Sequence, residues 1–261
     1  MRKEGGRIEI IYNLCKNSKT NKVNVSVLAK ELGVSEATIR RDLQKMEDMH
    51  LLRRFYGGAV INKDIEYEPT MNAKHLTNMH MKSPIAQYAA SLIRDNDVVY
   101  LDAGTTTEKV VNHIRAKNIL VFTQALSVVQ ALYERRINCY TFGGYLNFST
   151  NIIIDSNAIE RIKTYKFNIA FLGTNGINPL LGFTTTNEIE AMLKKQIISA
   201  TEAPYILSDS SKFNLTSNIK FADIHEVAII TEEKRNDVDY SKYGKVIFVE
   251  PKSRREEYGN R

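Results

Sequence analysis

Cysteine is scarce in this chain, and its two residues, Cys15 and Cys139, lie far apart. Neither belongs to a metal-ligand motif, so we expect free thiols in a reducing cytosol and no metal site. No apolar run reaches the roughly 18 residues of a membrane-spanning helix. The basic N-terminus also lacks the apolar segment of a secretory signal. These absences favour a cytoplasmic protein.

Histidine is equally sparse, and no motif of a common enzyme class is present. The five histidines are scattered, and none pairs with cysteine or glutamate at ligand spacing. The sequence contains no Gly-x-Ser-x-Gly elbow, no Walker A loop and no Gly-x-Gly-x-x-Gly fingerprint. We therefore expect no cofactor, no dinucleotide and no catalytic residue.

Positive charge is distributed unevenly along the chain. The formal net charge is +6, and residues 1–63 hold 13 basic and 7 acidic residues. The other 23 basic and 23 acidic residues balance. An electrically positive first quarter on a neutral body is typical of a segment that binds a polyanion such as DNA. A charged surface that contacts only water would give the same excess of basic residues.

Residues 1–62 have the pattern of a winged helix-turn-helix domain. Helical periodicity over Arg2–Lys16 is followed by a polar break over 17–24, and Ser26 suits the N-cap of a short helix that ends before Gly33. Ser35 then suits the cap of a second helix, Glu36–Met49. Two runs that flank Gly57-Gly58 predict a hairpin, the wing.

The second of these helices has the two faces that a reader of the major groove needs. Ile39, Leu43 and Met46 form an apolar stripe, which predicts the buried face. In such helices, residues near the N-terminus usually contact base edges, and flanking cations contact phosphate groups. The predicted base-facing residues are Ser35, Glu36, Ala37, Thr38 and Arg41. The other predicted DNA-binding residues are Ser26, Arg40, Lys45, Arg53 and Arg54.

Residues 63–82 are polar and aperiodic, which indicates a linker, and residues 83–261 indicate an α/β domain. Seven apolar runs predict strands, at 98–101, 119–123, 138–142, 167–172, 205–207, 226–230 and 245–249. Helical periodicity falls between them, at 84–94, 106–117, 126–135, 156–163 and 188–200. Strands that alternate with helices favour a mostly parallel sheet.

The first predicted strand of this domain runs into the polar stretch Asp102-Ala103-Gly104-Thr105-Thr106-Thr107 and then a helix. Glycine allows close approach of the backbone to an anion, and the helix N-terminus adds about half a positive charge. Open α/β sheets bind ligands at this end of their strands. The loop therefore predicts a phosphate site, although a threonine-rich N-cap with no ligand would look the same.

Three further loops follow strands and are expected to converge on that site. They supply Gly143 and Gly144, then Gly173, Thr174, Asn175 and Gly176, and finally Lys212 in the stretch Ser208–Phe213. Lys212 would provide a point charge against phosphate. Asp209 is expected to cap its own turn.

Several of these stretches resemble the DeoR family of bacterial sugar-operon regulators. The resemblance rests on Leu28–Leu43 and the wing Leu51–Ala59, and on Leu101–Thr107 and Asp209–Phe213 in the second domain. It implies a C-terminal α/β sensor domain similar in fold to ribose-5-phosphate isomerase. It also implies a repressor that a phosphorylated sugar releases from an operator, and a homo-oligomer, either dimer or tetramer.

Three positions depart from the family pattern. His50 and Gln124 stand where glycine and asparagine are usual, and Asn175 stands where aspartate is common. Gln124 is therefore expected to change the pocket wall and the effector preference. Asn175 argues against an isomerase-like enzyme, because an amide cannot serve as a base. An interaction module with a degenerate pocket stays open as a third class.

Overall fold

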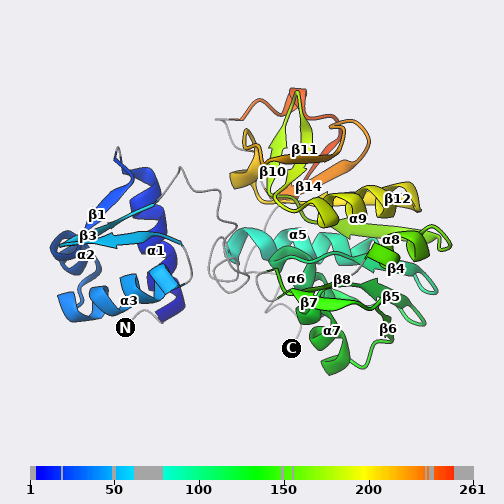
Figure 1. Cartoon of the computed structure of the whole chain (residues 1–261), viewed down its shortest axis with the longest axis horizontal. Coiled ribbons are helices and arrows are strands. Elements are labelled where there is room, and N and C mark those ends of the chain that lie inside the picture. Colours follow the sequence, from blue (N-terminus) through cyan, green and yellow to red (C-terminus); the bar gives the residue numbers. More distant parts are fainter. Residues whose placement is uncertain are drawn as a thin grey trace, which may run out of the picture. The chain divides into compact units, whose positions relative to one another are not determined.

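The computed structural model describes residues 4–18, 20–48, 51–61, 79–147, 150–154, 156–232, 234 and 238–249. The chain divides into two compact units, Met1–Met79 and His80–Arg261 (Figure 1). The first unit has one apolar core, and the second has one on each face of its main sheet. Each unit therefore has the buried interior that a separate domain needs.

The N-terminal unit is a winged helix-turn-helix fold, as expected. Its elements are α1 (Glu4–Asn17), β1 (Lys22–Asn24), α2 (Val25–Leu32), α3 (Glu36–Asp48), β2 (Arg53–Phe55) and β3 (Gly58–Val60). The strands form one antiparallel sheet in the order β1-β3-β2. The sequence pattern missed β1, because a three-residue polar strand shows no periodicity and exists only through its pairing with β3.

The predicted apolar stripe of α3 is confirmed. Ile39, Leu43 and Met46 are buried against residues of α1 and α2. Asp42 lies on the same buried side and accepts hydrogen bonds from Arg7, with Nε at 2.6 Å and Nη2 at 3.0 Å. Its partner is therefore on α1, and the pair fastens α1 to α3.

The cap of α2 also differs from the prediction. Asn24 is the N-cap, and its Oδ1 accepts from the Ser26 backbone N–H at 2.9 Å and from the Ser26 hydroxyl at 2.6 Å. Ser26 is thus inside the first turn, because the Asn24 side chain already accepts from the Ser26 backbone N–H at the start of the helix. At the other end, Gly33 ends the helix with φ +66°, where a side chain would be strained.

The main sheet of the C-terminal unit contains seven parallel strands. They are β4 (Val98–Leu101), β5 (Leu120–Thr123), β6 (Cys139–Tyr140), β9 (Phe167–Leu172), β12 (Thr201–Leu207), β14 (Ala228–Glu232) and β15 (Val246–Val249). Their order is β15-β14-β12-β9-β4-β5-β6. Each predicted strand overlaps one of them, so the expected parallel α/β sheet is confirmed.

Helices cover both faces of this sheet. One face packs on α5 (Met79–Ser91), α6 (Thr105–His113) and α7 (Leu126–Glu134), and the other on α8 (Ser156–Ile162) and α9 (Glu188–Ser199) (Figure 1). Residues 79–82 are helical although the sequence indicated linker, and Pro84 lies inside α5. Among the residues that the structure describes, no helix is long and apolar enough to cross a membrane.

Two small antiparallel sheets were not foreseen. One pairs β7 (Tyr145–Asn147) with β8 (Ile152–Ile154), and the other has the order β10-β11-β13. Its strands are β10 (Gly176–Asn178), β11 (Gly182–Thr185) and β13 (Ile219–Ala222). β7, β10 and β11 contain glycine or asparagine, residues that favour turns, and β8 and β13 are only three and four residues long. None of the five is long enough to show a clear strand pattern.

The strand order creates a switch point between β4 and β9. From β4 the chain proceeds outward to β5 and β6, whereas β9 leads through β12 and β14 to β15. The loops that follow β4 and β9 therefore leave the sheet in opposite directions at its carboxyl edge, where open α/β sheets bind ligands. These are the loops that contain Gly104 and Gly173.

Candidate functional site: a DNA-facing helix and an anion-binding sheet edge

The predicted DNA-binding residues form one exposed surface on the N-terminal unit. Nine of the ten are exposed, and Thr38 is half-buried. Ser35 lies before α3, where its hydroxyl accepts from the Thr38 backbone N–H at 3.2 Å. The predicted cap of α3 is therefore present, and it fixes the start of the helix that we expect in the major groove.

The four arginines of this surface differ in their intramolecular contacts. Arg40 is held by Glu36 at 2.9 Å, and Arg54 donates to Gln44. The side chains of Arg41 and Arg53 have no hydrogen bond or ion pair among the described residues. Their guanidinium groups are the ones that can meet DNA without first losing a protein contact.

The wing adds two residues that the sequence reasoning left out. Tyr56 at the hairpin tip is fully exposed, and Phe55 is about half exposed. Lys22 of β1 lies over the Phe55 ring at 6.0 Å from its centroid. Lys22 was missed because β1 was not expected, so nothing in the sequence placed this cation beside the wing.

In the C-terminal unit, the predicted phosphate loop lies at the carboxyl end of β4. Gly104 precedes α6, and no side-chain hydrogen bond caps the first turn of that helix. Thr105 and Thr107 are buried, and the Thr107 hydroxyl donates to the Gly104 carbonyl at 2.7 Å. Thr106 is half-buried. Uncapped N–H groups at a helix start can donate to an anion.

Asp102 is the centre of a buried ionic contact that joins three segments. Its carboxylate accepts from the Gly173 backbone N–H at 2.9 Å and from Lys194 of α9. Lys194 also donates to the Gly173 carbonyl at 3.1 Å. Asp102 and Lys194 are 2% and 4% exposed. This contact therefore connects the loops after β4 and β9 to α9, at the switch point.

Lys194 and two neighbours were missed by the sequence reasoning. Lys194 lies on the otherwise ordinary helix α9, beside a Glu190 that is 8% exposed. Tyr100 is fully buried, and burial raises its pKa well above the usual value, with the charges of Asp102 and Glu190 adding to the effect. No local motif marks these three residues, because only the packing of α9 on β4 brings them together.

Gln124 follows β5 at the position beside Asp102. In the parallel register of β4 and β5, Leu101 pairs with Thr123, so the next residue of each strand is Asp102 and Gln124. Gln124 is 1% exposed, and its Oε1 accepts from the Phe142 backbone N–H at 2.8 Å. Its Nε2 is buried without a hydrogen-bond partner in the described structure. Such a buried donor normally has a partner, which makes it a candidate ligand contact.

The remaining predicted loops differ in what they offer. Gly143 and Gly144 have φ +79° and +131°, and the Arg161 guanidinium is next to Gly143, 3.9 Å from the position of a Cβ atom there. Thr174 and Asn175 make their contacts inside the β10–β11 hairpin, with Thr184 and Thr185. Gly176 lies in β10, where a Cβ would come within 2.6 Å of the Leu215 carbonyl.

Lys212 lies in a short 3-10 helix, η1 (Ser210–Lys212), directly after β12 and Asp209. Asp209 caps this helix by accepting from the Ser211 N–H at 3.1 Å, as expected. Glu232 at the end of β14, which the sequence analysis did not single out, accepts from the Ser210 N–H at 2.9 Å. The carboxyl ends of β12 and β14 thus fix the loop that presents Lys212.

The described residues contain no cluster of three or more His, Cys, Asp or Glu side chains that could hold a metal ion. The carboxylates at the sheet edge are engaged by backbone N–H groups and Lys194, and the other polar groups there are amides, hydroxyls, Lys212 and a helix start. Such groups are suited to a small polar anion.

Comparison with known proteins identifies both domains. Residues 7–64 match the model of the DeoR-like helix-turn-helix domain, and residues 77–233 match that of the DeoR C terminal sensor domain. The chain therefore belongs to the DeoR family of transcriptional regulators. The expected fold class, a winged helix-turn-helix with an α/β sensor domain, is confirmed, and the chain is a regulator rather than an enzyme.

Individual relatives are similar over most of their length. A Bacillus subtilis protein named "Uncharacterized HTH-type transcriptional regulator FruR" is 39% identical over 82% of this chain and 86% of its own. The lactose phosphotransferase system repressor of Staphylococcus epidermidis is 28% identical over 85% and 89%. Ribose 5 phosphate isomerase A from Neisseria gonorrhoeae is a structural neighbour at 14% identity, covering 56% of each chain, with a TM-score of 0.38.

The buried pair makes a prediction about stability. Lys194→Met leaves the Asp102 carboxylate buried without its cation, which should lower the free energy of unfolding by about 3–5 kcal/mol. Urea unfolding of the full chain measures this loss. The double variant Lys194→Met/Asp102→Leu removes both charges and should recover most of it. Equal losses in the single and double variants would show that the ionic contact is not what stabilises the site.

Proposed function

We propose that this regulator represses a carbohydrate-metabolism operon and leaves its operator when a phosphorylated sugar binds at the carboxyl edge of the main sheet. The observation that carries the proposal is the uncapped start of α6 at the switch point, beside a buried Asp102 whose charge Lys194 already offsets. The names of relatives, such as the lactose phosphotransferase system repressor, support a carbohydrate as the signal.

The electrostatics of the sheet edge favour an anion. An unpaired Asp102 would repel phosphate, but its contacts with Lys194 and the Gly173 N–H offset that charge. The phosphate then binds the N–H groups at the start of α6, near Gly104, with Lys212 as the nearby cation. The hydroxyls of the sugar meet the polar groups on the β5 side, where Gln124 and the Gly143–Gly144 loop lie.

The DNA contact assigns different roles to the cations of the N-terminal unit. Arg41 reads a base edge from α3, because the helix presents it on the exposed side and its guanidinium has no partner among the described residues. Arg53 in the wing, together with Arg40, Lys45 and Arg54, contacts phosphates. Ser26, Ser35, Glu36, Ala37 and Thr38 complete the predicted interface. Paired winged domains in a homo-oligomer, a dimer or a tetramer, read paired half-sites.

Release is a two-state switch. The apo form holds two DNA-binding units at operator spacing, and effector binding favours a form in which they no longer fit. A ligand shifts such an equilibrium only by its difference in affinity for the two forms, about 5.5 kcal/mol for a change from 1:99 to 99:1.

An isomerase-like activity at the same edge has no support in the contacts. Proton abstraction from carbon needs a carboxylate close to the substrate. Asp102 is engaged by Lys194 and Gly173, and Asn175 is an amide whose Oδ1 accepts from the Thr185 hydroxyl at 3.1 Å.

Arg41→Ala should weaken binding to the operator by about 1–3 kcal/mol and relax the preference for one base pair, as loss of a base contact does. Arg40→Ala is the matched control, because Arg40 is held by Glu36. It should weaken binding to operator and unrelated DNA equally. Fluorescence anisotropy with both duplexes measures the two affinities. An equal loss on unrelated DNA for Arg41→Ala would make Arg41 a phosphate contact instead.

A panel of pentose and hexose monophosphates should contain a compound that raises the melting temperature of the chain and releases it from its operator. A ligand at 100 times its dissociation constant stabilises a fold by about 2.7 kcal/mol. Lys212→Ala should keep operator affinity and lose the release. No shift with any sugar phosphate would favour the interaction module with a degenerate pocket, and release retained in Lys212→Ala would remove Lys212 from the site.

Gln124→Met should reduce the affinity for that sugar phosphate about tenfold and leave the affinity for inorganic phosphate unchanged, since it removes one buried donor to the sugar. Gln124→Asn, with its shorter reach, should change the ranking of sugars. Isothermal titration calorimetry measures each affinity. Gln130→Met, an exposed position on α7, is the matched control. Parallel losses for sugar phosphate and inorganic phosphate would contradict a sugar-contacting role.

A further inference from the structure

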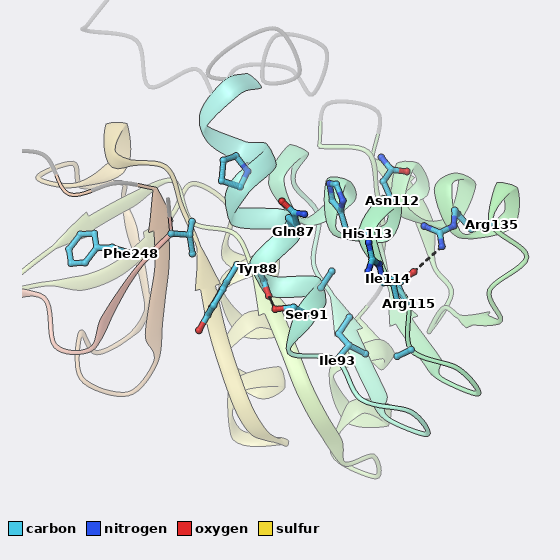
Figure 2. A pocket seen from close by; sticks show the side chains of 14 residues that line it. Gln87, Tyr88, Ser91, Ile93, Asn112, His113, Ile114, Arg115, Arg135 and Phe248 are labelled. Atoms are coloured by element: carbon cyan, nitrogen blue, oxygen red, sulfur yellow. Dashed lines mark hydrogen bonds between the residues drawn. The ribbon is translucent and has the colours of Figure 1, made fainter. Parts of the chain in front are cut away.

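A hollow of about 730 Å³ runs along α5, between the end of α6 on one side and β15 on the other (Figure 2). It shares no lining residue with the loops of the proposed effector site. The helix α6 separates the two places, because its N-terminus lies at the sheet edge described above and its last residues, Asn112 and His113, line the hollow. Nine helical residues span about 13 Å.

The wall of the hollow is positively charged. His113, Arg115 and Arg135 line it, and none of its fourteen lining residues is an aspartate or glutamate. The pKa of His113 is lowered first by burial and then by the cations of Lys109, Arg135 and Arg115. The same cations that disfavour a proton on this imidazole favour an anion beside it.

The basic side chains of the wall differ in their hydrogen bonds. Arg135 is fixed in place, because its guanidinium donates to the carbonyls of Val111 at 2.8 Å and Ile114 at 2.9 Å (Figure 2). The side chains of Arg115 and His113 have no hydrogen bond or ion pair within the described part of the chain. Capping of the helix end therefore accounts for Arg135 but leaves the Arg115 guanidinium and the His113 imidazole without a structural role.

The rest of the lining suits a ligand with an apolar body. Ala90 and Ile93 of α5, Ile114 after α6 and Val249 of β15 are all buried and form the apolar part of the lining. Above them the amides of Gln87 and Asn112 offer hydrogen bonds. A few polar groups over an apolar floor, in a volume between about 300 and 1,000 Å³, are typical of small-molecule sites.

We propose that this hollow is a second ligand site, which binds a small anionic compound that has an aromatic or aliphatic body. The acidic group of the ligand contacts Arg115 and His113, with Arg135 as a fixed cation beside them. Its body packs on the α5 floor. The site is independent of the sugar-phosphate site and gives the regulator a second chemical input.

The test uses the full-length chain and the anionic fluorophore anilinonaphthalene sulfonate, whose sulfonate and fused rings match this chemistry. Titration should show saturable binding of one dye molecule per chain. Arg115→Glu reverses one charge of the wall and should raise the dissociation constant about tenfold or more, the loss expected for a charge-assisted contact. Ser91→Phe, which fills the hollow from α5 without a charge change, should also abolish binding.

Lys117→Glu is the matched control, since it makes the same charge reversal two residues after Arg115 at an exposed position outside the lining. It should bind the dye as the parent chain does. Equal dye binding in Arg115→Glu and Lys117→Glu, or full binding in Ser91→Phe, would overturn the proposal. A change of molecular mass of Arg115→Glu in sedimentation would also overturn it, because the occupant would then be a second copy of the chain.

The outcome is separable from that of the proposed function. A sugar phosphate that stabilises the parent chain should stabilise Arg115→Glu to the same extent, and Lys212→Ala should bind the dye normally. Failure of one site therefore leaves the result for the other intact.

Discussion

The buried contact between Asp102 and Lys194 is the constraint on which the sensor site depends. A carboxylate and an ammonium group that are both almost fully buried need each other, because neither charge has enough water to stabilise it alone. Their pairing fixes α9 against the ends of β4 and β9 at the switch point. It also offsets the negative charge that would otherwise oppose an anion at this edge of the sheet.

The N-terminal unit uses an analogous device for a different purpose. Arg7 and Asp42 form a two-bond ion pair that fastens α1 to the inner side of α3. With Ile39, Leu43 and Met46 it holds that helix rigidly, so that the opposite side presents Arg41. In both units a buried acidic residue fixes the elements that present the proposed ligand contacts.

The carboxyl edge of the main sheet and the hollow along α5 present different polar groups. At the carboxyl edge, the carboxylates of Asp102, Asp209 and Glu232 organise loops through backbone N–H groups and a lysine. Along α5, the wall has cations and amides but no carboxylate. The first arrangement suits a ligand with many hydroxyls and a phosphate, and the second suits an acidic group on an apolar body.

The sequence by itself determined the class of this protein. Helical and strand periodicity located the recognition helix, its buried stripe and the seven strands of the main sheet, because these segments are long enough for burial to impose a pattern. Charge placement separated the DNA-binding unit from the sensor, and loop composition marked Gly104 and Lys212.

Only the tertiary structure decided which residues lie close in space although they are far apart in the chain. Lys194 becomes a partner of Asp102, β1 pairs with β3, and β13 pairs with β11. These features depend on contacts between distant segments, and no local pattern records such contacts.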